Sequence, residues 1–156
     1  LLRRAPSDDD EGALADRDGA LTALTVLGRA RGDSVPAVGA AFLALARRDS
    51  AGAADAFERA AAAAPDAAPQ LLLAAARVRQ ARGAVQEAEA LWARVLAGYP
   101  AAPEAAEAEL AWARALAARG DRAGARARLE HLIVTFAESA LAPVARRELD
   151  TLGGPP

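Results

Sequence analysis

The chain of 156 residues contains no cysteine, methionine, lysine or asparagine. Without cysteine, neither a disulfide framework nor a thiolate metal site can form, and the redox compartment is not indicated. Because methionine is absent, Leu1 is not an initiator residue, and we expect a processed product or a piece of a longer protein. The missing lysine and asparagine, with a single isoleucine at Ile133, are typical of a GC-rich bacterial genome.

The chain is also poor in aromatic residues (4%) and has no large excess of either charge, with 19 arginines against 21 acidic residues. This balance does not favour nucleic acid as a partner through bulk electrostatics, so we expect none. No apolar run approaches the roughly 20 residues that span a bilayer. The start of the chain lacks a signal-peptide pattern, because residues 1–4 are soon followed by four consecutive acids at 8–11. We therefore expect no direct membrane insertion by this segment.

Alanine is abundant, with 48 copies, and hydrophobic residues make up 53% of the chain. Alanine has the highest helix propensity of all residues, while its small side chain buries little area. Helices rich in alanine can approach one another closely, although each contact contributes modestly. The composition predicts an all-α fold.

A set of three residues recurs along the chain at a near-constant step, first after 35 residues and then after 37. A period in the mid-thirties, built from two helical stretches and a turn, is typical of a helical solenoid. Repeats of this kind form docking surfaces more often than catalytic sites. The recurring sets are Ala53, Phe57 and Pro65; Ala88, Trp92 and Pro100; and Ala125, Leu129 and Ala137.

Apolar periodicity, turn residues and capping residues together predict the element boundaries. We expect a flexible acidic segment at 1–12, a solenoid over 13–152 and a flexible tail at 153–156. The solenoid contains a leading helix and three repeats at about 34–67, 68–102 and 103–137, and a last helix, capped by Ser139, covers the end of the stack. The expected helices span residues 18–31, 35–48, 51–64, 68–82, 85–98, 103–119, 122–136 and 139–152.

The three units resemble tetratricopeptide repeats over roughly residues 34–137. The match rests on small residues at the helix crossings, one bulky column, turn glycines and closing prolines. Arg48 departs from the pattern, because the family usually has glycine there, and Ala137 replaces the closing proline. The matching residues are Ala41/Ala53, Ala76/Ala88 and Ala113/Ala125; Phe57, Trp92 and Leu129; Gly83 and Gly120; and Pro65 and Pro100.

The resemblance implies a right-handed α-solenoid of antiparallel helix pairs, a tetratricopeptide-type superhelix with a C-terminal capping helix. The closing stretch, residues 132–149, is similar to a bacterial form typical of envelope-associated proteins, such as those of outer-membrane assembly and of the Tol–Pal system. This likeness favours the bacterial periplasm or cell envelope over the cytoplasm.

In a tetratricopeptide superhelix, the first helix of each pair lines a concave groove. We expect Arg77 and Arg114, at equivalent positions, to form a basic pair near an apolar first unit. Such a groove would suit an extended or helical peptide with an apolar end and an acidic end. Alternatively, the arginines are solvated and their stems cover alanine-rich helices. Counted from the crossing alanines, the groove residues are Val35, Val38, Phe42 and Leu45; Gln70, Leu73, Arg77 and Gln80; and Glu107, Leu110 and Arg114.

No pattern in the chain indicates catalysis, a metal or another cofactor. The only histidine, His131, lies in the middle of an expected helix without visible partners, so we interpret it as a surface residue. Arg-Gly-Asp occurs at 31–33 and at 119–121, in both cases where a helix is expected to end. Glycine favours the left-handed cap conformation, and aspartate can start the next element, so both copies are interpreted as structural turns.

Two functions follow from these features. The first is a non-enzymatic scaffold that binds a protein or peptide partner in the groove. The alternative is a structural subunit that self-associates or packs into a larger assembly, through a face formed by Leu21, Leu24 and Leu27 and through the apolar patch of Phe42 and Leu45. An enzyme, or the recruiting arm of one, is a third reading that no residue supports.

Overall fold

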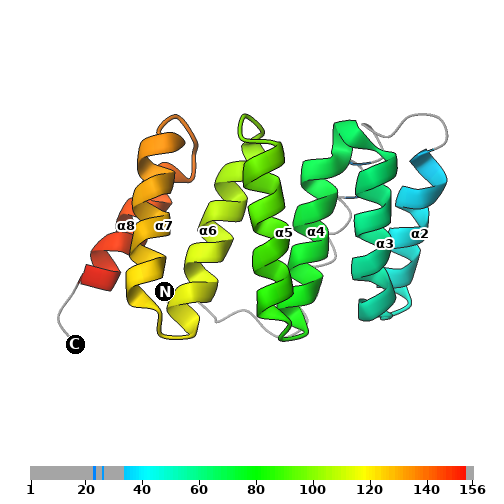
Figure 1. The fold of residues 1–156 in the computed structure, drawn as a ribbon, viewed down its shortest axis with the longest axis horizontal. Helices are drawn as coiled ribbons and strands as arrows, with labels where there is room; N and C mark the ends of the chain where they lie inside the picture. Colours follow the sequence, from blue (N-terminus) through cyan, green and yellow to red (C-terminus); the bar gives the residue numbers. More distant parts are fainter. Residues whose placement is uncertain (1–22, 24–25, 27–33, 154–156) are drawn as a thin grey trace, which may run out of the picture.

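The computed structural model describes residues 23, 26 and 34–153, and residues 34–153 fold into seven α-helices and one short 3-10 turn (Figure 1). No strand occurs in this part of the chain, so the all-α prediction is confirmed for it. The elements are α2 (Ser34–Ala46), α3 (Ser50–Ala63), η1 (Pro65–Ala67), α4 (Ala68–Ala81), α5 (Val85–Gly98), α6 (Pro103–Ala118), α7 (Arg122–Thr135) and α8 (Ala142–Gly153).

Consecutive helices pack against one another in chain order, and α4 also contacts α6. The molecule is therefore an elongated row that runs from α2 at one end to α8 at the other (Figure 1). Three helix pairs, α2/α3, α4/α5 and α6/α7, precede α8, in the predicted order. The expected segments 1–12 and 18–31 lie outside the described residues, apart from Ala23 and Val26, and so do Leu21, Leu24 and Leu27.

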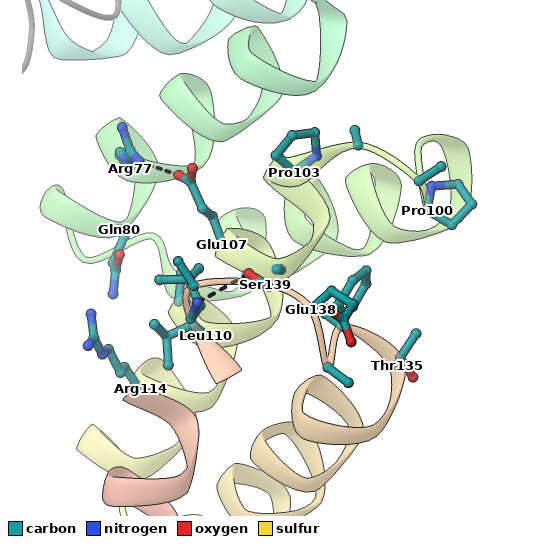
Figure 2. Close-up of a pocket in the computed structure, with 18 residues that line it drawn as sticks. Arg77, Gln80, Pro100, Pro103, Glu107, Leu110, Arg114, Thr135, Glu138 and Ser139 are labelled. Carbon is teal, nitrogen blue, oxygen red and sulfur yellow. Dashed lines mark hydrogen bonds and ion pairs between the residues drawn. The ribbon is translucent and has the colours of Figure 1, made fainter. Parts of the chain in front are cut away.

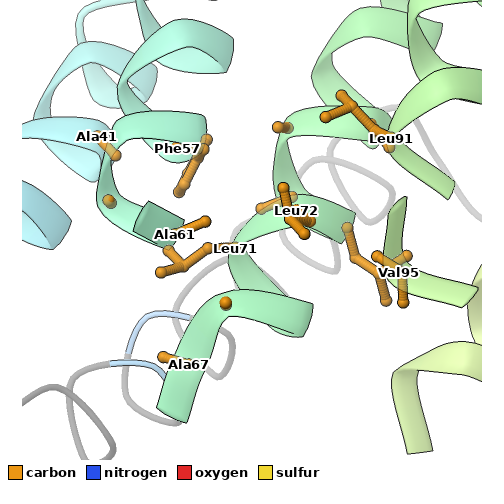
Figure 3. Close-up of a cluster of buried hydrophobic side chains, with 14 of the residues drawn as sticks. Ala41, Phe57, Ala61, Ala67, Leu71, Leu72, Leu91 and Val95 are labelled. Atoms are coloured by element: carbon orange, nitrogen blue, oxygen red, sulfur yellow. The ribbon is translucent and has the colours of Figure 1, made fainter. Parts of the chain in front are cut away.

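The predicted packing columns are confirmed. All six crossing alanines are buried, and the bulky residues of the second helices, Phe57, Trp92 and Leu129, are each at most 1% exposed. A close helix crossing has room only for a small side chain, while a large one fills the space between neighbouring pairs. Figure 3 shows Phe57 in this core, near Leu71 of α4.

The turns within the three pairs share one backbone conformation. Arg48, Gly83 and Gly120 have φ values of 58°, 80° and 87°, respectively. Glycine adopts this left-handed conformation easily, whereas a residue with a β-carbon is strained there. Arg48 therefore keeps the turn that the repeat needs, even though its residue type disfavours it.

Aspartates follow two of these turns and cap the next helix. The carboxylates of Asp49 and Asp121 each accept a hydrogen bond of 2.9 Å from a backbone N–H in the first turn of the helix, that of Gly52 in α3 and that of Gly124 in α7. Such caps satisfy one of the N–H groups that a helix start leaves unpaired. The Arg-Gly-Asp at 119–121 is thus a turn followed by a cap, while the copy at 31–33 lies outside the described residues.

The last helix begins at Ala142, three residues later than expected. The Ser139 hydroxyl accepts a hydrogen bond from the backbone N–H of Leu141 (3.2 Å), and the Ser139 backbone N–H donates to the carbonyl of Phe136 (2.9 Å). Ser139 therefore stabilises the connection before the helix, and the expectation that it caps the helix directly was wrong. A serine side chain often closes a local turn in this way.

One arginine joins three helices. Arg79 of α4 forms ion pairs with Asp55 and Glu58 of α3 and with Glu87 of α5, at 3.4 Å from Glu58 and 2.8 Å from Glu87. Burial lowers the pKa of Arg79, but the carboxylates of Glu87, Asp55 and Glu58 more than offset this effect, so the pKa lies above its ordinary value. The guanidinium stays charged and ties α4 to both neighbours.

The candidate partner-binding groove

A groove of about 1220 Å³ lies where α4 and α6 meet the two connections that precede α6 and α8 (Figure 2). Five of the predicted groove residues line it together. The repeat register that placed these residues on one face of successive helices therefore brings them to one surface. They are Arg77, Gln80, Glu107, Leu110 and Arg114.

The lining is apolar in the middle and charged along one side. Figure 2 shows Leu110 near the centre, with Arg77, Glu107 and Arg114 on one side and Glu138 on the other. Six alanines complete much of the surface, two of them on α6 and four in the connections before α6 and α8. The remaining lining residues are Gln80, Pro100, Ala101, Ala102, Pro103, Ala106, Ala111, Thr135, Phe136, Ala137, Ser139, Ala140 and Leu141.

Both arginines of the groove are paired with a glutamate from the next first helix of the row. Arg77 of α4 lies 3.0 Å from Glu107 of α6. Arg114 of α6 contacts Glu148 of α8 through two nitrogens, Nε at 3.0 Å and Nη2 at 2.5 Å from the same oxygen. These side chains are substantially exposed, so each pair contributes little to the free energy of folding. The groups remain available to a partner.

The charges thus differ from the expected basic pair. Along the rim, positive and negative side chains alternate, because each arginine reaches a carboxylate on the next helix. The sequence of a single helix does not show this, since the paired residues are 30 and 34 positions apart. The groove is therefore close to neutral and contains both signs of charge.

The other predicted groove residues lie elsewhere. Val38 and Leu73 are buried in the core, and the Phe42 ring packs edge-on against Phe57 with centroids 5.1 Å apart. Gln70 is buried and donates a hydrogen bond to Glu104, also buried, which joins α4 to α6. Val35 and Leu45 are exposed on α2, away from the residues that line the groove.

Sequence reasoning missed a buried carboxylate, Glu109, which is 0% exposed. Its oxygens lie 3.3–3.4 Å from Arg128 and 2.6 Å from Nδ1 of His131, both on α7. The guanidinium of Arg128 also stacks on the Trp112 ring at 3.6 Å from its centroid. A charge out of water needs such compensation. The helical spacing of the sequence could have indicated this burial, because Glu109 lies on the same face of the helix as Ala105 and Leu116, both of which are buried.

The cluster of Glu109, Arg128 and His131 lies on the side of α6 that faces away from the charged rim of the groove, since Glu107 and Arg114 project from the other side of the helix. His131 is thus a structural partner of Glu109 as well as a partly exposed residue. Within residues 23, 26 and 34–153, no three side chains of metal-ligating type come together. No helix described by the structure is both long and apolar enough to cross a bilayer.

Comparison of the chain with protein-family models, with curated proteins and with solved structures finds no match in any of the three.

Proposed function

We propose that the helix pairs form a right-handed tetratricopeptide-type superhelix and that the chain is a non-enzymatic scaffold of the bacterial periplasm or cell envelope. It binds a segment of a protein partner in the groove beside α6. The observation that supports this most is the convergence of five groove residues, predicted from repeat register alone, on one open groove. The resemblance of residues 34–137 to tetratricopeptide repeats supports the superhelix.

The chemistry of the groove suggests the kind of segment that it accepts. Leu110, Phe136 and Leu141 offer apolar contacts, and the alanines let a partner backbone or helix approach closely. The rim carries both signs of charge, at Arg77, Glu107 and Arg114 among others. An amphipathic helix with one apolar face and charges of both signs beside it matches these features. A purely acidic segment does not, because the carboxylates of Glu107 and Glu138 in the lining would repel it.

A peptide selection tests the proposal. A random library of displayed peptides, about 16 residues long so that they span roughly four helical turns, is selected on the full chain. The affinity of each selected peptide is then measured by calorimetry for Arg114→Glu and for Arg94→Glu. Arg94 is the matched control, because it is similarly exposed and is also paired with one glutamate, Glu58, but lies outside the groove.

We expect Arg114→Glu to weaken binding at least tenfold and Arg94→Glu to leave it within about twofold, which corresponds to a loss of about 1.4 kcal/mol or more at the groove alone. Leu110→Ala should weaken it as well. Peptides that bind wild type and both variants equally, or a library that yields no binder, would contradict the groove as the partner site.

Self-association is the second function to consider. Of the residues expected to serve it, Phe42 and Leu45 lie outside the groove, while Leu21, Leu24 and Leu27 lie outside the residues that the structure describes. The two functions can therefore be tested separately.

A further inference from the structure

The groove beside α6 contains four charged side chains, and three of them already contact an opposite charge. Arg77 of α4 pairs with Glu107 of α6 at 3.0 Å, while Arg114 of α6 pairs with Glu148 of α8. The fourth is Glu138, an exposed residue in the connection between α7 and α8. Among the residues that the structure describes, its carboxylate has no ion-pair partner. Glu138 therefore leaves one negative charge of the groove uncompensated.

Glu138 lies across the groove from the other charges. Figure 2 shows Arg77, Glu107 and Arg114 on one side of Leu110 and Glu138 on the other. The lining around Glu138 comes from the end of α7 and from the connection after it, and we call this part of the lining the acidic edge. A segment bound in the groove lies between the acidic edge and the mixed charges of α4 and α6, so it presents a different side to each. The acidic edge consists of Thr135, Phe136, Ala137 and Glu138.

The end of α7 adds negative charge to the acidic edge. Helix α7 ends at Thr135, so its C-terminus lies at the groove. The last carbonyl groups of a helix have no partner within the helix, and together they carry a partial negative charge. A basic residue in the last turn often balances this charge, but α7 has none there. Independently of Glu138, the acidic edge thus favours a positively charged group.

Apolar surface adjoins the acidic edge. Phe136 and Leu141 are half-buried, and both line the groove. Lysine and arginine place their long apolar stems along such a surface and keep the charged end at its border. A basic side chain of a partner segment can therefore use both features, the apolar lining and the acidic edge.

We propose that the partner helix bound in this groove carries arginine or lysine on the side that faces the acidic edge, and that Glu138 selects for this charge. The inference rests on the proposed function, because it specifies the segment that the groove accepts. A helix with a neutral residue at this place leaves Glu138 unpaired, and an acidic residue is repelled. The opposite side of the helix meets both signs of charge, so its sequence is less restricted.

The first test repeats the peptide selection on Glu138→Lys with the same library. We expect peptides selected on wild type to be enriched in arginine and lysine beside their apolar face, and peptides selected on Glu138→Lys to carry aspartate or glutamate there. Asp66→Lys is the matched control. Asp66 of η1 is also exposed and has no ion-pair partner in the described part of the chain, but it lies outside the groove. Selection on this control should give basic peptides, as wild type does.

The second test is a double-mutant cycle measured by calorimetry. In a peptide selected on wild type, the basic residue beside the apolar face is replaced by glutamine, and the protein carries Glu138→Gln. We expect each change alone to weaken binding about threefold, as for an exposed ion pair, and both changes together to weaken it hardly further. Glu138→Lys should weaken the unmodified peptide at least tenfold, because it places two like charges together.

The outcomes separate this inference from the proposed function. Leu110→Ala tests the groove without changing its charge. Peptides that lose affinity for Leu110→Ala but bind Glu138→Lys as tightly as wild type would overturn the inference and leave the groove as the partner site. Peptides indifferent to both variants would contradict the groove itself, and the inference with it. Circular dichroism and thermal unfolding of each variant confirm that it is folded, so that a change of affinity reports on the contact alone.

Discussion

The first helix pair, α2/α3, and the last, α6/α7, pack in the same way, but the first pair is apolar where the last pair contains a charged side chain. Both cross at buried alanines and both place a large residue, Phe57 or Leu129, between pairs. Next to Phe57 the first pair has another aromatic ring, whereas the last pair encloses Glu109. The buried alanines thus set how closely the two helices of a pair cross, and the residues on the other faces of each helix can differ between pairs.

That freedom separates two surfaces. The first helix of the first pair, α2, carries no charged residue, and its Val35 and Leu43 are exposed. The first helix of the last pair, α6, carries Glu107 and Arg114 in the groove and Glu109 on its opposite side. Two of the three buried polar side chains in the described part of the chain, Glu104 and Glu109, also lie on α6.

Truncation of the large buried residues Phe57 and Leu129 should have the largest effect on the free energy of unfolding. We expect Phe57→Ala to lower the free energy of unfolding by about 4 kcal/mol, because it leaves a cavity and also removes the contact with Phe42. Leu129→Ala in the last pair should cost about 3 kcal/mol, since a smaller side chain is lost. Urea unfolding at one fixed protein concentration measures both. A smaller loss for Phe57→Ala than for Leu129→Ala would contradict the apolar character of the first pair.

Substitutions in the cluster of Glu109, Arg128 and His131 should have unequal effects on the free energy of unfolding. Arg128→Met leaves a carboxylate that is 0% exposed with only His131 as its partner, and we expect it to cost about 3 kcal/mol. Glu109→Leu removes the buried charge and leaves partners that water can reach, so its effect should lie within about 1 kcal/mol of zero. The double variant should recover most of the stability lost in Arg128→Met. Equal costs for the two single variants would show that Glu109 is not the buried charge in need of compensation.

The turn of the first pair should give the smallest effect. Arg48→Gly should raise the free energy of unfolding by about 1 kcal/mol, because glycine adopts a φ of 58° without strain. Arg48→Ala is the control: it removes the same side chain but keeps the β-carbon, so it should change little. In the last pair, Gly120→Ala should lower stability by about 1 kcal/mol. If Arg48→Ala stabilises the protein as much as Arg48→Gly, the gain comes from the lost charge and the explanation through the backbone is wrong.

Features that depend on local sequence could be predicted. Helix ends at Gly83, Pro65 and Pro100, and burial of the crossing alanines, follow from propensity and repeat register, and the structure agrees. Part of the groove lining could be predicted for the same reason. Which residues of α4 and α6 share a surface depends only on register, and five of the predicted residues line the groove.

Features that depend on contacts between distant helices could not be predicted. The partner of Arg114 is Glu148, 34 residues away on a helix whose start was misplaced by three residues. The burial of Gln70 against Glu104 depends on how closely α4 and α6 approach, which alanine content alone does not fix. Val38 was expected to face a groove, but it lies on the side of α2 that the core covers.

Native mass spectrometry of the full chain with a groove-binding peptide from the selection tests the partner site most directly. We expect one peptide bound per chain for wild type and for Arg94→Glu, and little or none for Arg114→Glu at the same peptide concentration. Equal occupancy of Arg114→Glu and Arg94→Glu would contradict the groove beside α6 as the partner site.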